Sequence, residues 1–495
     1  MTTTSPSTST ATSGYRATDS VRPTARRLAP HPDRLLPPDA GLRDLSRSIY
    51  QSVAGAPIYS PHGHVDAAII AENRPFGNPA ELLITPDHYV TRLIHSYGIG
   101  LDQLGVNTPE ADPREIWRIF CSHWPIFAGT VVRYWFESEL SEVFGLTEQP
   151  SAQNADDLYD QLSEQLAKPE FRPRELFERF NIAVLATTDD PASDLSAHQR
   201  LAADPDFTGA VLPTFRADRY MSPAAPGWAG YLAELAAAAG VDTDSYAGLV
   251  EALRNRRAYF KENGATATDS GMADAYAISL PDAEAERIHR AGLDGTVTPA
   301  ESTAYRRNLL YQLATMSAED GLVMQLHADV VRNYDQVSFD TYGPDTGHDL
   351  PGPATFTTGL RQVLNEFGRS DTFRLVLFTT DETSFSQQIA PLAGFYPSVY
   401  VGAPWWFIDT PAAIGRFRAA ATDSAGFGKT SGFIDDTRAY CSIPARHDMS
   451  RRLDAGFLAG LVATHQLDED EAHEIAGDLA GPIPVNTFRL GRYAH

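Results

Sequence analysis

Eight short runs of apolar and β-branched residues end next to side chains that can do chemistry, and this feature constrains the fold most. Each run is about as long as a buried strand. The residues that follow the runs are His, Arg, Asp, Thr or Trp, which a purely structural strand has no reason to place there repeatedly. The runs are 58–59 before His62 and His64, 181–186 before Asp189, 211–215 before Arg216, 265–268 before Asp269, 322–326 before His327, 373–378 before Thr379, 398–402 before Trp405 and Trp406, and 431–434 before Asp435 and Asp436.

Helical patterns separate several of these runs, for example over residues 231–239, 283–291 and 410–421. Alternation of strands and helices predicts an α/β fold with a parallel sheet. Eight units predict a closed (β/α)8 barrel of the TIM type, in which the active site is built at the carboxyl ends of the strands. An open, doubly wound sheet is the structural alternative.

The first and second runs are separated by about 115 residues. A crossover between parallel strands needs only about a dozen residues. The apolar spacing over residues 114–120 and 130–143 fits amphipathic helices. We therefore predict a mostly helical inserted subdomain over about residues 67–180.

The amino terminus has a different composition from the rest of the chain, because twelve of its first twenty residues are Ser or Thr. We expect residues 1–28 to form a disordered tail and residues 29–495 to form the barrel with its insertion. The segment lacks the apolar core of a secretory signal, and an organelle transit peptide is the alternative interpretation. The two cysteines, Cys121 and Cys441, lie far apart and indicate a reducing compartment, for which we take the cytoplasm.

The formal net charge of −24 excludes several classes of partner. Nucleic-acid binding needs a basic face, and no apolar stretch approaches the roughly 18 residues of a transmembrane helix. A small anionic substrate would meet a repulsive overall field, so that its site would need local arginines. A homo-oligomer is compatible with the sequence.

The first candidate site is a metal centre at His62-Gly63-His64. Residues i and i+2 of a strand face the same way, roughly 6.5 Å apart, so two imidazoles can share one ion. Open zinc sites take three ligands from His, Asp or Glu, and Asp436 is preferred over Asp435 as the carboxylate. His327 reaches the same rim, where it contacts substrate or metal or remains a hydrogen-bonded core histidine. Without this convergence, the two histidines are ordinary loop residues.

The second candidate site is a pair of arginines, Arg216 after the third run and Arg438 two residues past Asp436. Guanidinium groups bind carboxylates through paired hydrogen bonds. No phosphate-binding glycine loop accompanies them, so a carboxylate is favoured over a phosphate. The alternative for each arginine is a structural ion pair.

Further residues extend the predicted pocket. The insertion contributes Asp87-His88-Tyr89, and the seventh run leads into Trp405-Trp406 and Asp409. Trp406 suits the apolar face of a sugar chain and Asp409 suits its hydroxyl groups, whereas Trp405 fits the core. The turn-rich loop 343–349 either reaches the mouth of the barrel or only shapes turns.

Taken in order, these stretches resemble the uronate isomerase (glucuronate isomerase) family, over residues 58 to about 452. The matching stretches are His62-Gly63-His64-Val65-Asp66, Ala71-Glu72-Asn73-Arg74-Pro75-Phe76, Asp87-His88-Tyr89, Thr187-Thr188-Asp189-Asp190-Pro191, Leu212-Pro213-Thr214-Phe215-Arg216, Gln325-Leu326-His327, Trp405-Trp406-Phe407-Ile408-Asp409-Thr410 and Asp436-Thr437-Arg438. Two stretches depart from the family pattern, Tyr59-Ser60-Pro61 and Thr268-Asp269-Ser270-Gly271.

The resemblance implies a metal-dependent barrel of the amidohydrolase superfamily, acting in hexuronate catabolism. Such an enzyme interconverts D-glucuronate with D-fructuronate, and D-galacturonate with D-tagaturonate. By resemblance, a divalent ion, in our expectation zinc, is held by His62, His64 and Asp436. The uronate is bound by Arg216 and Arg438. The pocket is lined by His88, Tyr89 and Trp406.

Within this hypothesis, Asp436 accepts a proton from a substrate hydroxyl, Tyr89 or His88 shuttles a proton at C1 and C2, and His327 and Asp409 complete the substrate site. Two rival functions stay open. One is a metal-dependent hydrolase of the same superfamily acting on a small carboxylate-bearing substrate. The other is a barrel that binds sugar acids without turnover.

Overall fold

The computed structural model describes residues 26–493. The predicted tail therefore lies, up to residue 25, outside the described residues. Its last positions pair with the insertion, because Arg27 forms an antiparallel bridge with Glu148 and the Leu28 amide donates to the carbonyl of Thr147 at 2.8 Å. Leu28 is buried. Residues 27 and 28, which we expected in the tail, therefore pair with the insertion.

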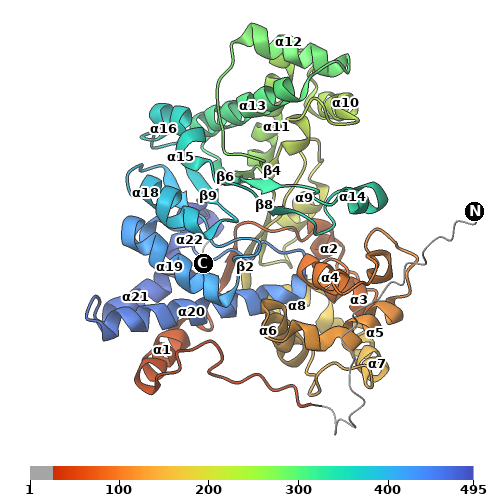
Figure 1. Cartoon of the computed structure of the whole chain (residues 1–495), viewed down its shortest axis with the longest axis vertical. Helices are drawn as coiled ribbons and strands as arrows, with labels where there is room; N and C mark the ends of the chain where they lie inside the picture. Colours follow the sequence, from red (N-terminus) through yellow and green to blue (C-terminus); the bar gives the residue numbers. More distant parts are fainter. Residues whose placement is uncertain (1–25, 494–495) are drawn as a thin grey trace, which may run out of the picture.

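Parallel strands occupy the centre of the molecule and helices surround them (Figure 1). One sheet has three strands in the order β1-β2-β3, and a second has five in the order β10-β9-β6-β5-β4. All pairings within these two sheets are parallel, which confirms the predicted α/β class. The strands are β1 (Ile58–Ser60), β2 (Ile182–Ala186), β3 (Ala210–Leu212), β4 (Phe215–Arg216), β5 (Ala267–Asp269), β6 (Val323–His327), β9 (Leu375–Phe378) and β10 (Val399–Val401), with β7 (Val330–Val331) and β8 (Leu350–Pro351) forming an antiparallel pair.

Seven of the eight predicted runs contain strands, and two runs differ in detail. Pro213 divides the third run into β3 and β4, because proline has no N–H for the ladder. The eighth run is not a strand, since Gly432 and Asp436 have positive φ angles of 71° and 41°. Its first residue and the segment that follows it are still paired, because Ser431 N–H donates to the Val401 carbonyl and His64 N–H donates to the Thr437 carbonyl, at 2.9 and 3.0 Å.

The strands bury both faces. In β6, Met324 and Leu326 pack into the large core beneath the surrounding helices. Val323, on the other face, joins a second core cluster together with Tyr59 of β1 and Ile434 of the eighth run. Residues from both sheets therefore meet in one interior. His327 shares the face of Val323, because side chains two residues apart point the same way.

Every element assigned between β1 and β2 is a helix, as the amphipathic patterns predict. In Figure 1 these helices gather to one side of the strands. Aromatic rings of Trp117, Phe120 and Phe136 are fully buried in their core. The main helices of the insertion are α2 (Ala67–Glu72), α3 (Pro79–Leu83), α4 (His88–His95), α5 (Pro113–His123), α6 (Val131–Ser138), α7 (Ala155–Leu166) and α8 (Pro173–Arg179).

The remaining helices cover the strands, and their ends carry local signals. The longest begins at a capping box of Thr298 and Glu301 and ends at Gly321, whose φ of 78° suits glycine. No helix within residues 26–493 is long and apolar enough to cross a lipid bilayer. The helices are α1 (Ala40–Val53), α9 (Ser196–Ala203), α10 (Trp228–Ala239), α11 (Tyr246–Glu262), α12 (Asp282–Leu293), α13 (Pro299–Asp320), α14 (Gln336–Tyr342), α15 (Phe356–Gly359), α16 (Arg361–Phe367), α17 (Glu382–Ser384), α18 (Ala390–Ala393), α19 (Pro411–Ala425), α20 (Ile443–Ala463), α21 (Glu469–Ala480) and α22 (Pro482–Thr487).

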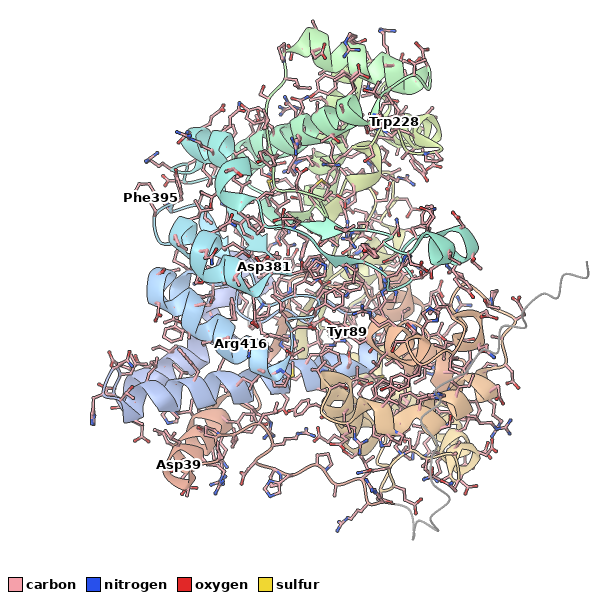
Figure 2. The ribbon with its side chains drawn as sticks, in the orientation of Figure 1. Asp39, Tyr89, Trp228, Asp381, Phe395 and Arg416 are labelled. Carbon is pink, nitrogen blue, oxygen red and sulfur yellow. The ribbon has the colours of Figure 1, made fainter. Side chains whose placement is uncertain are left out.

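The insertion core gives a stability prediction. The Phe120 ring lies 4.8 Å from Phe136 and 5.3 Å from Trp117, centroid to centroid. We expect Phe120→Ala to lower the free energy of unfolding by about 3–5 kcal/mol, because it leaves a cavity. The same change at Phe395, which is 67% exposed and lies at the edge of the molecule (Figure 2), should alter it by less than about 0.5 kcal/mol. Urea denaturation followed by circular dichroism measures both, and equal effects would contradict the assigned core.

Candidate functional site

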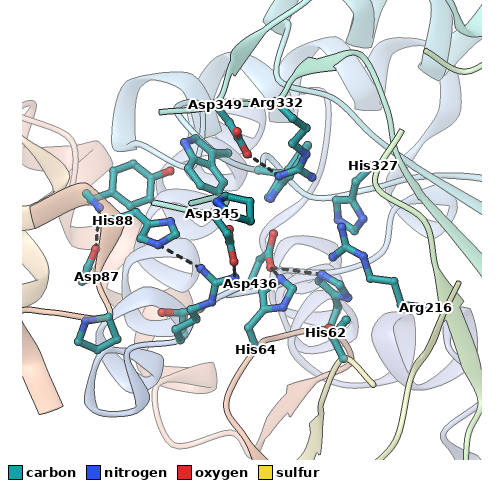
Figure 3. Close-up of a pocket in the computed structure, with 18 of the residues that line it drawn as sticks. His62, His64, Asp87, His88, Arg216, His327, Arg332, Asp345, Asp349 and Asp436 are labelled. Carbon is teal, nitrogen blue, oxygen red and sulfur yellow. Dashed lines mark hydrogen bonds and ion pairs between the residues drawn. The ribbon is translucent and has the colours of Figure 1, made fainter. Parts of the chain in front are cut away.

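A cavity of about 420 Å³ opens where β1, β4 and β6 end, and the insertion and the segment around α14 complete its walls (Figure 3). The cavity contains both candidate sites that the sequence predicts. The residues that line it are His62, His64, Pro86, Asp87, His88, Tyr89, Thr188, Arg216, His327, Arg332, Asn333, Pro344, Asp345, Asp349, Trp405, Trp406, Asp436, Thr437, Arg438 and Arg446.

The Asp436 carboxylate joins the two predicted metal-binding histidines. Its Oδ1 lies 3.2 Å from His62 Nε2 and 3.0 Å from His64 Nε2. The positive φ of Asp436 sets the direction of this side chain, and Asp is among the residues that tolerate such a backbone. The predicted trio therefore converges, although residues 62 and 436 lie at opposite ends of the fold's sequence.

His327 belongs to the same cluster. Its ring stacks on His62 with centroids 4.6 Å apart. Ligand atoms of His62, His327 and Asp436 all lie within 4.8 Å of one another. The Nε2 of His327 is buried and has no hydrogen-bond partner among the described residues. A buried nitrogen without a partner, beside a carboxylate and further imidazoles, fits a divalent ion.

Burial and charge act in opposite directions on these groups. Burial alone would lower the pKa of His62, but the charges of Asp436 and Asp269 outweigh it and raise that pKa. Burial alone would raise the pKa of Asp436, but His62 and His64 hold it well below its ordinary value. For His327, burial outweighs Asp269 and lowers the pKa. Asp436 is therefore ionised at neutral pH and His327 is neutral.

Arg216 reaches the cavity from the end of β4, and its partners come from neighbouring elements. Parallel register places it beside Asp269 of β5, and its Nη1 lies 3.0 Å from Asp269 Oδ2. The Nε of Arg216 donates a hydrogen bond to Asp218 Oδ2 at 2.7 Å. The other oxygen of Asp269 lies 2.6 Å from His327 Nδ1. Asp269 thus links the arginine to the histidine cluster.

Arg438 is paired with the half-exposed carboxylate of Asp345. Its Nη2 donates to Asp345 Oδ2 at 2.5 Å, and its Nη1 lies 3.2 Å from His88 Nε2. Burial and then the Arg438 charge lower the pKa of His88 to about 4, so that this imidazole is neutral at pH 7. Loop 343–349, for which we left two interpretations open, therefore reaches the cavity.

Arg332 is a cavity residue that the sequence analysis missed. Its Nη1 donates to Asp349 Oδ2 at 2.6 Å. A Cβ placed on Gly271 would stand 2.3 Å from Arg216 Nη2 and 2.8 Å from Arg332 Nη2. The two guanidinium groups therefore converge in the space that the missing side chain of Gly271 leaves. No motif marks Arg332, and its position five residues after His327 was the only available signal.

Tyr89 and His88 enter the cavity from the first turn of α4. Asp87 caps this helix by accepting the Tyr89 amide at 2.9 Å. The Tyr89 hydroxyl donates to Asp409 through a short hydrogen bond. Asp409 does not line the cavity and lies behind Tyr89, so that it is not placed against a substrate as the sequence analysis expected.

The other predicted residues lie in the cavity wall. Trp406 lines the cavity beside His88, with ring centroids 5.7 Å apart. Trp405 is buried in an interior core cluster, as we expected, and it also borders the cavity. Asp435 faces away, and its Oδ2 lies 3.0 Å from His447 Nε2. This arrangement agrees with the choice of Asp436 over Asp435.

The charges around the cavity balance. Arginine and aspartate each contribute four of its lining residues. This local balance contrasts with the net charge of −24 of the whole chain. A divalent cation bound to the histidine cluster would make the cavity positive, which favours a small anion.

Comparisons with known proteins show the family of the chain. The family model described as glucuronate isomerase matches residues 42–482. A uronate isomerase of Corynebacterium efficiens is 50% identical over 464 residues, which cover 93% of this chain and 99% of the relative.

Two solved structures are similar as well. The crystal structure of glucuronate isomerase from Caulobacter crescentus has a TM-score of 0.92 and 40% identity, and covers 95% of this chain and 99% of its own. That of uronate isomerase from Thermotoga maritima has a TM-score of 0.86 and 29% identity, with coverages of 92% and 98%. The chain therefore belongs to the uronate isomerase family.

Proposed function

We propose that this isomerase interconverts D-glucuronate with D-fructuronate, and D-galacturonate with D-tagaturonate. The observation that carries the proposal is the convergence of a His–Asp cluster and several guanidinium groups in one cavity. A hexuronate presents hydroxyl groups at one end and a carboxylate at the other, and these two sets of residues match the two ends.

The chemical difficulty is the weak acidity of a carbon next to a carbonyl group. An aldose–ketose isomerase moves a proton between C2 and C1 through a cis-enediolate, which needs a base and groups that stabilise the oxygen. Asp436, ionised at neutral pH, accepts the proton of a substrate hydroxyl. Tyr89 or the neutral His88, both of which line the cavity, takes the proton from C2 and delivers it to C1.

Arg216 and Arg438 bind the carboxylate of the substrate. This contact fixes the position of the other, reacting end of the sugar. Asp269, a partner of Arg216, is fully buried. The side chain of Asp345, the partner of Arg438, is 51% exposed. A substrate carboxylate can therefore replace Asp345 on Arg438 at little cost, because the displaced carboxylate returns to water.

A divalent metal, in our proposal zinc, fits His62, His64 and Asp436, with His327 as a further ligand. The buried Nε2 of His327, which has no hydrogen-bond partner within residues 26–493, supports this assignment. Bound there, the ion would act as a Lewis acid toward a substrate oxygen. Trp406, whose ring lies beside His88, packs against the sugar chain.

We also infer that the two sheets are parts of one closed (β/α)8 barrel. A parallel bridge between Asp189 and Phe215 supports continuity from β2 to β4. The backbone bonds of Ser431 and His64 support closure through the eighth run. The shared interior cluster supports the same arrangement.

The function is tested by incubating the protein with D-glucuronate in D2O and following the reaction by NMR. We expect ketouronate signals to appear while glucuronate decreases, and galacturonate to give tagaturonate in the same way. Consumption of an amide or lactone substrate with no ketose from either uronate would support the rival hydrolase. A metal-loaded protein that converts neither uronate would support a binding role.

The anion site gives a kinetic prediction. We expect Arg438→Met to lower kcat/KM for glucuronate by on the order of 10² or more, which corresponds to about 3 kcal/mol. Arg416→Met is the matched control, since Arg416 is 63% exposed and pairs with Glu382 on the surface. Steady-state kinetics should give wild-type values for the control. Unchanged kinetics for the Arg438 variant would refute its anion-binding role.

The metal site gives a prediction that does not depend on activity. We expect His62→Ala to reduce the metal content of the purified protein to a small fraction of one ion per chain, because it removes a central ligand. The control is His95→Ala, at the exposed end of α4. Elemental analysis of both proteins after dialysis measures the difference. A His62 variant with wild-type metal content would remove the assignment.

A further inference from the structure

The hydroxyl group of Tyr89 is fixed by protein groups on two sides. It donates its proton to Asp409 Oδ1, and it accepts the backbone N–H of Phe407 at 2.8 Å. A phenol has one donor and further acceptor capacity, so these two partners define the hydroxyl orientation. The Tyr89 hydroxyl therefore meets a substrate in one fixed direction.

The second oxygen of Asp409 contacts Arg446 of α20. The distance from Arg446 Nη1 to Asp409 Oδ2 is 3.4 Å. Arg446 is 3% exposed, its Nε donates to Ser442 Oγ at 2.9 Å, and its guanidinium stacks on the Trp135 ring at 3.5 Å. These contacts fix the guanidinium plane, and the guanidinium in turn holds the Asp409 carboxylate.

Arg446 also lies beside the residue that orients the Tyr89 backbone. Its Nη2 is 3.9 Å from Asp87 Oδ2, and the other oxygen of Asp87 accepts the Tyr89 amide. Burial raises the pKa of both Asp87 and Asp409, and the charge of Arg446 opposes that rise in each. One buried guanidinium therefore lies beside both of the acidic side chains that hold Tyr89, Asp87 at its backbone and Asp409 at its hydroxyl.

The backbone beside Asp409 supports the same interpretation. Phe407 has a φ of 68°, in the left-handed region that a bulky residue adopts only when the surroundings impose it. Arg92 of α4 stacks on the Phe407 ring at 4.4 Å, and the Phe407 amide donates to the Tyr89 hydroxyl. The turn after β10 is thus fixed against α4 in the geometry that Tyr89 needs.

We propose that Arg446 and Asp409 are positioning residues for Tyr89, and that Arg446 does not bind the substrate carboxylate although it lines the cavity. Through Asp409 and Asp87, Arg446 sets the direction of the Tyr89 hydroxyl during proton transfer. The inference rests on the proposed isomerisation and deepens it, because it separates this arginine from the anion-binding pair Arg216 and Arg438.

A double-mutant cycle with Tyr89→Phe tests the proposal. We expect Arg446→Met to lower kcat for glucuronate by on the order of 10- to 100-fold, since displacement of a reacting group by about 1 Å has such an effect. KM should change by less than about threefold. In the Tyr89→Phe background the same change should add less than about threefold, because the group it positions is already absent.

Arg438→Met in both backgrounds is the matched control. Its effect should be the same with and without the Tyr89 hydroxyl, because it acts on the substrate carboxylate. An Arg446→Met effect that is equally large in both backgrounds, or that falls on KM alone, would overturn the positioning role and indicate direct contact with substrate. Arg446→Lys, which retains the charge beside Asp409, should recover part of the lost kcat.

Loss of Arg446 leaves two buried carboxylates without their cation, so that this variant is at risk of not folding. Asp409→Asn is the second variant, since it is similar in shape and neutral, and it should show the same dependence on Tyr89. Crystal structures of either variant provide a readout without activity. We expect the Tyr89 hydroxyl to leave hydrogen-bonding distance of the Phe407 amide, and an unmoved hydroxyl would overturn the proposal.

The two proposals can fail separately. A wild-type protein that forms no ketouronate would refute the proposed function. The crystal structures would still decide whether Arg446 and Asp409 position Tyr89.

Discussion

The contact of Asp436 with His62 and His64 is the interaction on which the site depends. It joins the residues after the first strand to those after the eighth run, so that side chains from distant parts of the sequence meet in one place. The backbone bond from His64 to Thr437 supports the same junction. His327 and Asp269 then connect this junction to Arg216. Residues far apart in the chain are thereby held within a few ångströms of one another.

Pairing of buried charges is the second constraint. Asp269, Asp409 and Arg446 are all nearly inaccessible to water, and isolated charges in such places would be costly. Each is held by at least one opposite charge or a strong hydrogen bond. The same pairs that satisfy these groups also fix their directions, and fixed directions are what a site for proton transfer requires.

Much of this arrangement could be predicted from the sequence. The α/β class, the helical insertion and the convergence of His62, His64, Arg216 and Asp436 follow from short apolar runs that end in reactive side chains, because parallel strands share one carboxyl edge. The prediction of an eighth strand was wrong, because a hydrophobic pattern does not reveal the positive φ angles of Gly432 and Asp436.

Other residues of the site could not be found from the sequence. Asp269 was noted as the end of a run, but its role depends on cross-strand register with Arg216. Arg332 comes from a loop whose path is set by tertiary contacts with Asp349. Asp409 was expected at the substrate because it follows two tryptophans, and its actual place behind Tyr89 depends on how α4 packs against the turn after β10.

The carboxylate of Asp345 on Arg438 has a consequence for turnover. In the free protein the Asp345 side chain pairs with Arg438 as the carboxylate of a sugar acid would, so that the Arg438 guanidinium already has an anionic partner. If Arg438 binds the uronate as we propose, each binding event exchanges one ion pair for another of the same kind. The net affinity for the uronate is then modest. Release of the product is assisted, because the Asp345 carboxylate at the rim of the cavity competes with it for Arg438.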